Sequence, residues 1–165
     1  GGVIVNGAPL HGLMHPEIGH LPIPRIAWPD GRMDDYAGAC SYHGGGGFEG
    51  LASGPAVGAR AGRPAEEIPD DDLIWELEAG YLAVGLASIV LALSPRRIVV
   101  GGGVLQRGNV LNRTRERLRD VLAGYVGRPE VTLPNDAYVV APRFGQDAGL
   151  VGAIALAEAA VGSGR

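Results

Sequence analysis

The sequence predicts an α/β fold, in which helices cover a sheet that is at least partly parallel. Short apolar runs that are typical of strands alternate with helical patterns along the second half of the chain. The longest helical pattern, residues 73–93, is apolar on one face and then increasingly all round, which is typical of a helix buried in a core. In addition, the cluster Gly101–Gly103 directly follows an apolar run and precedes a helical segment, as in a strand–turn–helix unit.

The first third of the chain is predicted to contain little regular structure. Residues 1–12 predict a hairpin, because Asn6-Gly7 between two short strand-like runs is a strong turn signal. Residues 13–47 hold no long periodic segment and are interrupted by prolines, so we expect a loop-rich excursion. A loop of this length inside a compact domain usually has a function or an anchor, and a metal ion is one such anchor.

The remaining elements are expected to follow in chain order. They are a helix of small residues at 48–61, a linker at 64–72 whose Asp70–Asp72 favour the next helix start, the helix at 73–93, a strand at 97–100, a helix with an arginine-rich outer face at 109–126, strands at 131–133 and 138–141, and a helix at 146–161. The tail Ser163–Arg165 is expected to be frayed.

Composition excludes several classes of function. The chain has 165 residues, enough for one domain or one lobe of a larger protein, and its net charge of −4 gives no electrostatic reason to bind nucleic acid or an anionic membrane. All 14 basic residues are arginine, which excludes a Walker-type phosphate loop and lysine chemistry. A single cysteine excludes an internal disulfide and fits a reducing compartment. The most apolar run, residues 81–93, is shorter than the ~20 residues that a membrane span requires, and no signal peptide is visible. We therefore expect a soluble cytoplasmic protein.

Three residues in the loop-rich region are candidate metal ligands. A Cys-x-x-His pair, Cys40 and His43, with His20 upstream, offers the sulfur and imidazole donors that structural zinc prefers. Loop histidines and a buried thiol would give the same pattern. A closed zinc site needs a fourth ligand, for which the sequence offers several candidates and selects none: His11, His15, Asp34, Asp35 or water.

Two glutamates near these residues are candidate ligands for sugar hydroxyls. Glu17 and Glu49 lie among glycines, and each carboxylate can accept hydrogen bonds from two hydroxyls, while the His20 imidazole can take another. Without further information, both could equally be solvated surface acids. The Gly101–Gly103 turn could admit a nucleotide against bare backbone, although it lacks the last glycine of a dinucleotide fingerprint and would also suit a plain tight turn. Neither a G-x-S-x-G elbow nor an H-E-x-x-H motif occurs, so hydrolase chemistry is disfavoured.

Three motifs together resemble the ROK sugar kinases, most closely the bacterial fructokinase branch. They are H-P-E-I-G-H (15–20), C-S-Y-H-G-G-G-G-F-E-G-L-A-S-G-P-A (40–56) and I-V-V-G-G-G-V-L (98–105). The resemblance implies an actin-like ATPase (ribonuclease H-like) fold of two α/β lobes, with transfer of the γ-phosphate of ATP, bound with Mg²⁺, to the 6-hydroxyl of fructose. Residues 1–165 would then form a single domain, the C-terminal lobe, with residues 13–47 as an inserted zinc and substrate loop.

The same resemblance assigns roles to individual residues. Glu17, His20 and Glu49 would contact the sugar, and His20, Cys40 and His43 would hold a structural zinc ion. The adenosine site would be lined by Pro55, Gly101, Gly102, Gly103, Val104 and Leu105, with Gly1 and Gly2 as the remnant of a phosphate-binding turn.

The sequence departs from the family pattern in two places. The family's fourth zinc ligand, a second cysteine, is replaced by glycine at Gly46 or Gly47. The first phosphate loop and the aspartate that acts as general base precede the point where this chain starts, so no catalytic residue is expected here and the chain alone is expected not to phosphorylate a sugar.

Several partners and rival functions follow from the resemblance. We expect a hexose substrate, an N-terminal lobe outside this sequence and a homo-oligomer. We also expect self-association through apolar surface on residues 150–161 and on the helix after Glu49. The rivals are a kinase or repressor of the same family that acts on another hexose or an amino sugar, and a non-catalytic, metal-stapled sugar-binding module.

Overall fold

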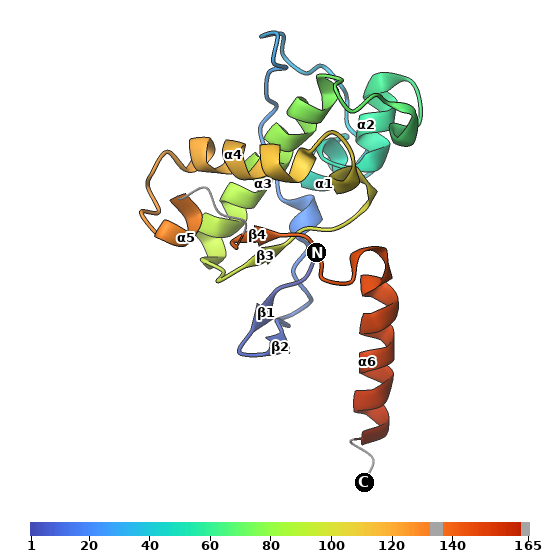
Figure 1. Ribbon diagram of the computed structural model, residues 1–165, viewed down its shortest axis with the longest axis vertical. Coiled ribbons are helices and arrows are strands. Elements are labelled where there is room, and N and C mark those ends of the chain that lie inside the picture. The colour runs from blue at the N-terminus through green and yellow to red at the C-terminus, as the bar shows by residue number, and fades with distance from the viewer. Residues whose placement is uncertain (133–136, 163–165) are drawn as a thin grey trace.

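One long helix, α3 (Ile74–Leu93), runs through the middle of the main body, and the other layers pack against it (Figure 1). The computed structural model describes residues 1–132 and 137–162. The helix is buried over most of its length, as its apolar sequence predicts. Asp72 helps to start it, because its side-chain Oδ1 accepts a hydrogen bond from the backbone N–H of Ile74 at 2.9 Å.

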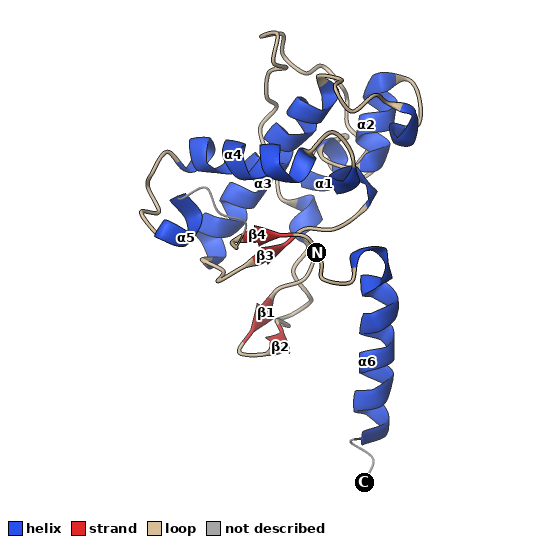
Figure 2. Cartoon of the chain, in the orientation of Figure 1, coloured by secondary structure: helices blue, strands red, loops and turns tan. Residues whose placement is uncertain are grey.

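The remaining elements combine helices with short strands, as the predicted α/β class requires (Figure 2). In chain order they are β1 (Ile4–Val5), β2 (Ala8–Pro9), the 3-10 turn η1 (Ile18–His20), α1 (Phe48–Leu51), α2 (Gly54–Ala61), η2 (Ala65–Glu67), β3 (Ile98–Val99), η3 (Gly103–Gln106), α4 (Val110–Leu122), α5 (Pro129–Thr132), β4 (Val139–Val140), η4 (Gly145–Asp147) and α6 (Ala148–Gly162).

Both strand pairs are short. Strands β1 and β2 form the expected antiparallel hairpin, with Asn6 and Gly7 in the left-handed conformation at its turn. Strands β3 and β4 pair in parallel, with Ile98 opposite Val139, so the predicted parallel component of the sheet is confirmed.

The core consists of three apolar clusters that share α3. The second half of α3 packs against α4, β3 and β4, while its first half packs against α2 and the η3 turn. A third cluster joins Leu77 and Tyr81 of α3 to α1 and to the loop at residues 23–36. The helix therefore holds the loop region and the glycine turn in fixed positions relative to each other.

Three predicted elements are wrong in extent or type. The small-residue helix at 48–61 is two helices, because Ser53 caps the second one by accepting a hydrogen bond from the N–H of Ala56 at 3.3 Å. Helix α4 ends at Leu122 rather than at residue 126, since Ala123 adopts the left-handed conformation. Of the strand predicted at 131–133, the first two residues belong to the helix α5, and the third lies outside the described residues, as does the tail predicted to be frayed.

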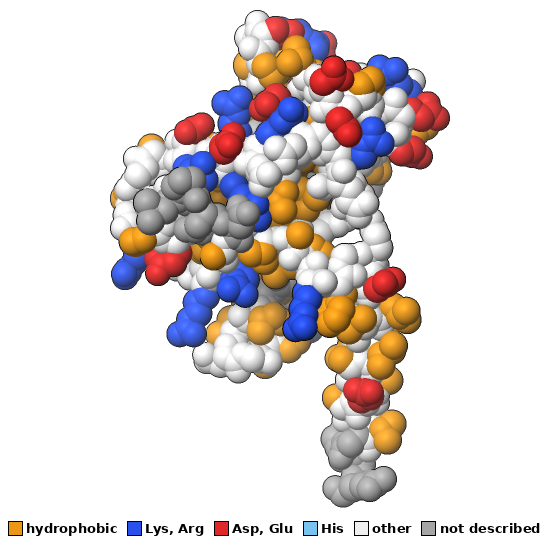
Figure 3. All heavy atoms as spheres, in the orientation of Figure 1, with side chains coloured by type: hydrophobic (Ala, Val, Ile, Leu, Met, Phe, Trp, Pro, Cys, Tyr) orange, Lys and Arg blue, Asp and Glu red, His pale blue; other side chains and the backbone are white. Residues whose placement is uncertain are grey.

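Helix α6 extends away from the main body and carries exposed apolar side chains (Figures 1 and 3). The exposed fractions of Leu156 and Val161 are both 74%, and Leu150 and Ile154 are also exposed. By contrast, α2 buries Ala56 and Val57 in the core, so the segment after Glu49 does not offer the apolar surface expected of it.

By length and composition, α3 would also be long and apolar enough to cross a membrane. The length argument made for residues 81–93 therefore does not extend to the whole helix. However, half of the most apolar stretch of this helix is buried inside the protein, and the core helix of a folded domain has the same composition.

Candidate functional site

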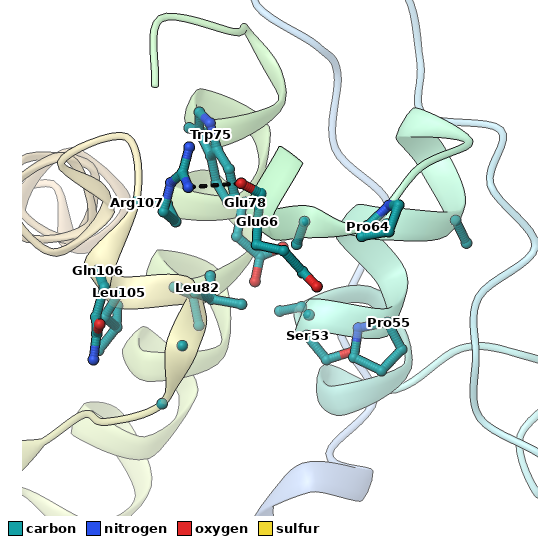
Figure 4. A pocket seen from close by; sticks show the side chains of 18 of the residues that line it. Ser53, Pro55, Pro64, Glu66, Trp75, Glu78, Leu82, Leu105, Gln106 and Arg107 are labelled. Atoms are coloured by element: carbon teal, nitrogen blue, oxygen red, sulfur yellow. Dashed lines mark hydrogen bonds between the residues drawn. The ribbon is translucent and has the colours of Figure 1, made fainter. Parts of the chain in front are cut away.

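The largest cavity described lies between α2, η2, α3 and the glycine turn after β3, and its volume is about 990 Å³. It brings together all six residues predicted for the adenosine site, Pro55, Gly101, Gly102, Gly103, Val104 and Leu105. Strand β3 ends at Val99, so the chain turns through glycines at one wall, while Ser53 and Pro55 begin α2 at another (Figure 4). Gly1 and Gly2 are not among the residues that line this cavity; Gly1 lies beside Ile18.

A buried carboxyl group in this cavity was not predicted. Glu78 of α3 is 1% exposed, and neither of its carboxyl oxygens has a hydrogen-bond partner among the described residues. Burial raises the pKa of Glu78 to about 8, and Arg60 opposes this rise only in part. Its spacing could have revealed it, because Trp75, Glu78 and Leu82 fall on one face of the helix and the other two are apolar.

The three predicted metal ligands meet at one point. The Cys40 sulfur lies 3.3 Å from Nδ1 of His43 and 3.7 Å from Nδ1 of His20, and the potential donor atoms of the three residues lie within 4.8 Å of one another. Ligands around a tetrahedral zinc ion are about 3.5 Å apart, so these positions fit such an ion. The pKa of Cys40 is lowered, chiefly by a hydrogen bond from the backbone of Tyr42, which favours the thiolate that binds metal.

The other candidate ligands do not join this group. Asp34 is 2% exposed and is held by Arg60 and Tyr81: its Oδ2 accepts hydrogen bonds at 2.8 Å from Arg60 Nη2 and at 2.6 Å from the Tyr81 hydroxyl. His15 pairs with Glu17, with 2.7 Å between Nε2 and Oε1. Within the described part of the chain, Asp35 and His11 are also outside the group that could hold a metal.

The contacts of Asp34 with Arg60 and Tyr81 anchor the loop region to two helices. Arg60 belongs to α2 and Tyr81 to α3, while Nη1 of Arg60 also donates to the carbonyl of Leu51 at 2.8 Å. Burial by itself raises the pKa of Asp34, but the hydrogen bonds from Arg60 and Tyr81 outweigh it, and the net effect is a lowered pKa. Sequence reasoning considered Asp34 only as a metal ligand, so this anchor was missed.

Two of the predicted sugar-binding residues are also close together. Nε2 of His20 lies 3.6 Å from Oε1 of Glu49, at the start of α1. The Glu49 carboxylate packs against Gly19: a Cβ atom there would lie 2.5 Å from Oε2, so the glycine of the E-I-G-H motif makes room for it. Glu17 precedes η1, and its side-chain contact is with His15 rather than with His20.

His20 connects the two groups through its two ring nitrogens. Nδ1 faces the Cys40 sulfur, and Nε2 faces the Glu49 carboxylate. Chemically, such an arrangement can fix the orientation of a ring that contacts a sugar hydroxyl while a metal ion orders the loop. Glu49 keeps more than half of its side chain exposed, so its oxygens remain accessible.

The chain is similar to several known proteins. The ROK family model matches residues 1–160. A Bacillus subtilis protein is 42% identical over 160 residues, and the Zymomonas mobilis fructokinase is 40% identical over 162 residues; both alignments cover 97% of this chain, and they cover 52% and 51% of those proteins. The solved ROK hexokinase of Thermus thermophilus superimposes with a TM-score of 0.63 at 27% identity, over 92% of this chain and 51% of that chain.

The fold and the matched proteins define a sugar-kinase class, whose members have the actin-like ATPase fold. Within that class, the chain belongs to the ROK family. A second solved structure, from Cytophaga hutchinsonii, has a TM-score of 0.59 at 19% identity and supports the fold alone. The chain spans about half the length of the curated relatives that it matches.

Proposed function

We propose that this chain is the C-terminal lobe of an ATP-dependent hexose kinase that phosphorylates fructose at its 6-hydroxyl. The observation that carries the proposal is the convergence of Pro55 and the Gly101–Leu105 segment on one cavity, as expected for an adenosine site. Two relatives named fructokinase, from Zymomonas mobilis and Pediococcus pentosaceus, at 40% and 34% identity, support the choice of sugar. The exposed apolar face of α6 supports a second lobe or subunit as its partner.

In this proposal the chain binds and orients both substrates. Glu17, His20 and Glu49 accept or donate hydrogen bonds to the sugar hydroxyls, and carboxylates bind such hydroxyls more strongly than neutral groups do. The glycine turn lets the nucleotide approach the backbone. Phosphoryl transfer depends mainly on positioning and on a proton acceptor, and we assign the acceptor to the other lobe.

Zinc is the ion that we propose for His20, Cys40 and His43. When bound, it would link η1 to the loop at residues 40–47 and so order the sugar site; its role is structural. The donor set is short of the usual four protein ligands, so water or a further residue would complete it. Gly46 is where a replacement ligand fits best, because its backbone is not left-handed and a Cβ would meet only the His43 carbonyl, at 3.4 Å.

We expect about one zinc ion per purified chain, measured by elemental analysis after dialysis. Cys40→Ala should lose the zinc, and Gly46→Cys should hold it against a chelator that strips the wild type, because it completes a four-ligand site. His11→Ala is the control, since His11 lies outside the group and should not change the zinc content. Equal zinc content in wild type and Cys40→Ala would contradict the assignment.

Activity is tested by joining this chain to the N-terminal half of the Zymomonas mobilis fructokinase. We expect the fusion to phosphorylate fructose with ATP and the isolated chain to be inactive. Glu49→Gln in the fusion should lower kcat/KM for fructose by roughly 10- to 100-fold, the effect of weakening hydrogen bonds to a charged group. The exposed Glu67→Gln serves as control.

Three outcomes of this assay would change the proposal. Phosphorylation by the isolated chain would show that the other lobe is not required. A folded fusion that prefers glucose or an N-acetylated amino sugar over fructose would move the substrate to another hexose, consistent with the relative named hexokinase. A folded fusion without any kinase activity would favour a non-catalytic sugar-binding module.

A further inference from the structure

Glu78 places a carboxyl group in the interior, and the packing of the protein does not explain why the residue there is polar. Its carboxyl group is buried on α3, where the charge of Arg60 acts on it without a hydrogen bond, and both oxygens lack a partner among residues 1–132 and 137–162. Burying a polar group without a hydrogen bond is costly, and such groups are rare in folded proteins. An apolar side chain of similar size would fill the same space at a lower cost in folding free energy. The carboxyl group therefore indicates a ligand that forms hydrogen bonds with it.

The position of Glu78 indicates which ligand. Trp75, Glu78 and Leu82 form the α3 wall of the large cavity, and Glu78 is the polar residue of the three. In the close-up view its side chain lies between Leu82 and Leu105 on one side and Ser53 and Pro55 on the other (Figure 4). A single polar group on an apolar wall is how binding pockets fix the orientation of a flat, mainly apolar ligand.

We propose that Glu78 binds the base of the nucleotide as an uncharged carboxylic acid, donating one hydrogen bond through its O–H and accepting one through its carbonyl oxygen. This inference rests on the proposal that the cavity is the ATP site. Adenine presents a donor, its 6-amino group, beside a ring-nitrogen acceptor, and the protonated carboxyl is the complementary pair. The raised pKa, about 8, is consistent with the uncharged form at neutral pH.

The glycine turn lines the same cavity as Glu78. Gly101–Gly103 belong to the segment expected to contact the adenosine, and they offer bare backbone at another wall of this cavity. A nucleoside that contacts this turn therefore occupies the cavity that Glu78 also lines. Arg63 and Glu66 also line the cavity, but both are exposed and can form hydrogen bonds to solvent. Glu78 is buried and cannot.

The test compares ATP with purine riboside triphosphate, which lacks the 6-amino group. Binding to the purified chain is measured by calorimetry for the wild type, Glu78→Gln and Glu78→Met. We expect the wild type to prefer ATP by about tenfold, because one hydrogen bond is lost and a buried acceptor is left unpaired with the analogue. Glu78→Gln, which keeps a donor and an acceptor, should retain the preference. Glu78→Met should bind ATP and the analogue with equal affinity, because its side chain can form neither hydrogen bond with the base. Its affinity for ATP should be lower than that of the wild type.

Unfolding is separated from loss of binding by the thermal midpoint of each variant. Glu78→Met removes an unpaired buried polar group, so it should melt at or above the wild-type temperature. Equal affinity of the wild type for both ligands, or an unchanged preference in a folded Glu78→Met, would overturn the role of Glu78 while leaving the ATP site intact. Absence of ATP binding by the wild type would overturn both this inference and the proposed nucleotide site. Glu67→Gln, exposed and outside the cavity, should behave as wild type.

Discussion

Asp34→Ala will lower the free energy of unfolding by about 3–5 kcal/mol, measured by urea denaturation at neutral pH. The change removes the partner of Arg60, whose side chain is 2% exposed, and leaves a charge buried without compensation. It also removes the acceptor of the Tyr81 hydroxyl. Because the same carboxylate ties the loop region to α2 and α3, we expect the zinc content of this variant to fall as well.

Two further variants separate charge from packing at this anchor. Asp35→Ala, at the exposed neighbouring carboxylate, should change stability by less than about 0.5 kcal/mol. The double variant Asp34→Leu with Arg60→Met replaces the ion pair by apolar groups, so it should lose less stability than Asp34→Ala alone. If Asp34→Ala unfolds at the same urea concentration as Asp35→Ala, the buried pair does not anchor the loop.

Glu78 will make the stability of the wild-type protein fall as the pH rises from about 5 to 8. Its pKa is displaced from an ordinary 4.5 to about 8 by burial, so the folded state keeps a proton that the unfolded state loses in this range. By linkage, the stability that the folded protein owes to the protonated form of Glu78 is fully present below pH 4.5, and it is lost as the pH approaches and passes 8. Its full size is about 5 kcal/mol.

The measurement is a series of urea titrations between pH 5 and pH 8.5. Glu78→Gln does not titrate, so the free energy of unfolding of the wild type should decline relative to this variant across the range. Glu67→Gln, which changes an exposed carboxylate, should follow the wild-type slope. Parallel profiles for wild type and Glu78→Gln would mean that Glu78 titrates normally in the folded protein.

Sequence reasoning was most successful where the residue type itself limits the chemistry. His20, Cys40 and His43 are the donors that zinc prefers, and the structure places them together. The Gly101–Leu105 segment and Pro55 likewise line one cavity, and their role in binding adenosine stays a prediction. The hairpin at Asn6-Gly7 and the long helix were predicted correctly, since each has a strong local signal.

The missed features depend on contacts between distant parts of the chain. Asp34 and Arg60 are 26 residues apart, and no local pattern marks them as a pair. The break between α1 and α2 had a local signal, the cap Ser53 followed by Gly54-Pro55, which was outweighed by the run of small residues. Glu78 was not singled out in the sequence, although its spacing from Trp75 and Leu82 places it on the buried face.

The two ring nitrogens of His20 have a thermodynamic consequence. One faces the cysteine and the other faces Glu49, so the orientation of a single imidazole is common to both neighbourhoods. An ion that fixes the ring through Nδ1 removes rotational freedom that a sugar bound at Glu49 would otherwise have to restrict. If the proposed zinc ion and sugar both bind, they would be heterotropic partners: each would strengthen the binding of the other by the same factor, as reciprocity of binding free energies requires. Zinc availability would set the sugar concentration at which this lobe becomes half occupied.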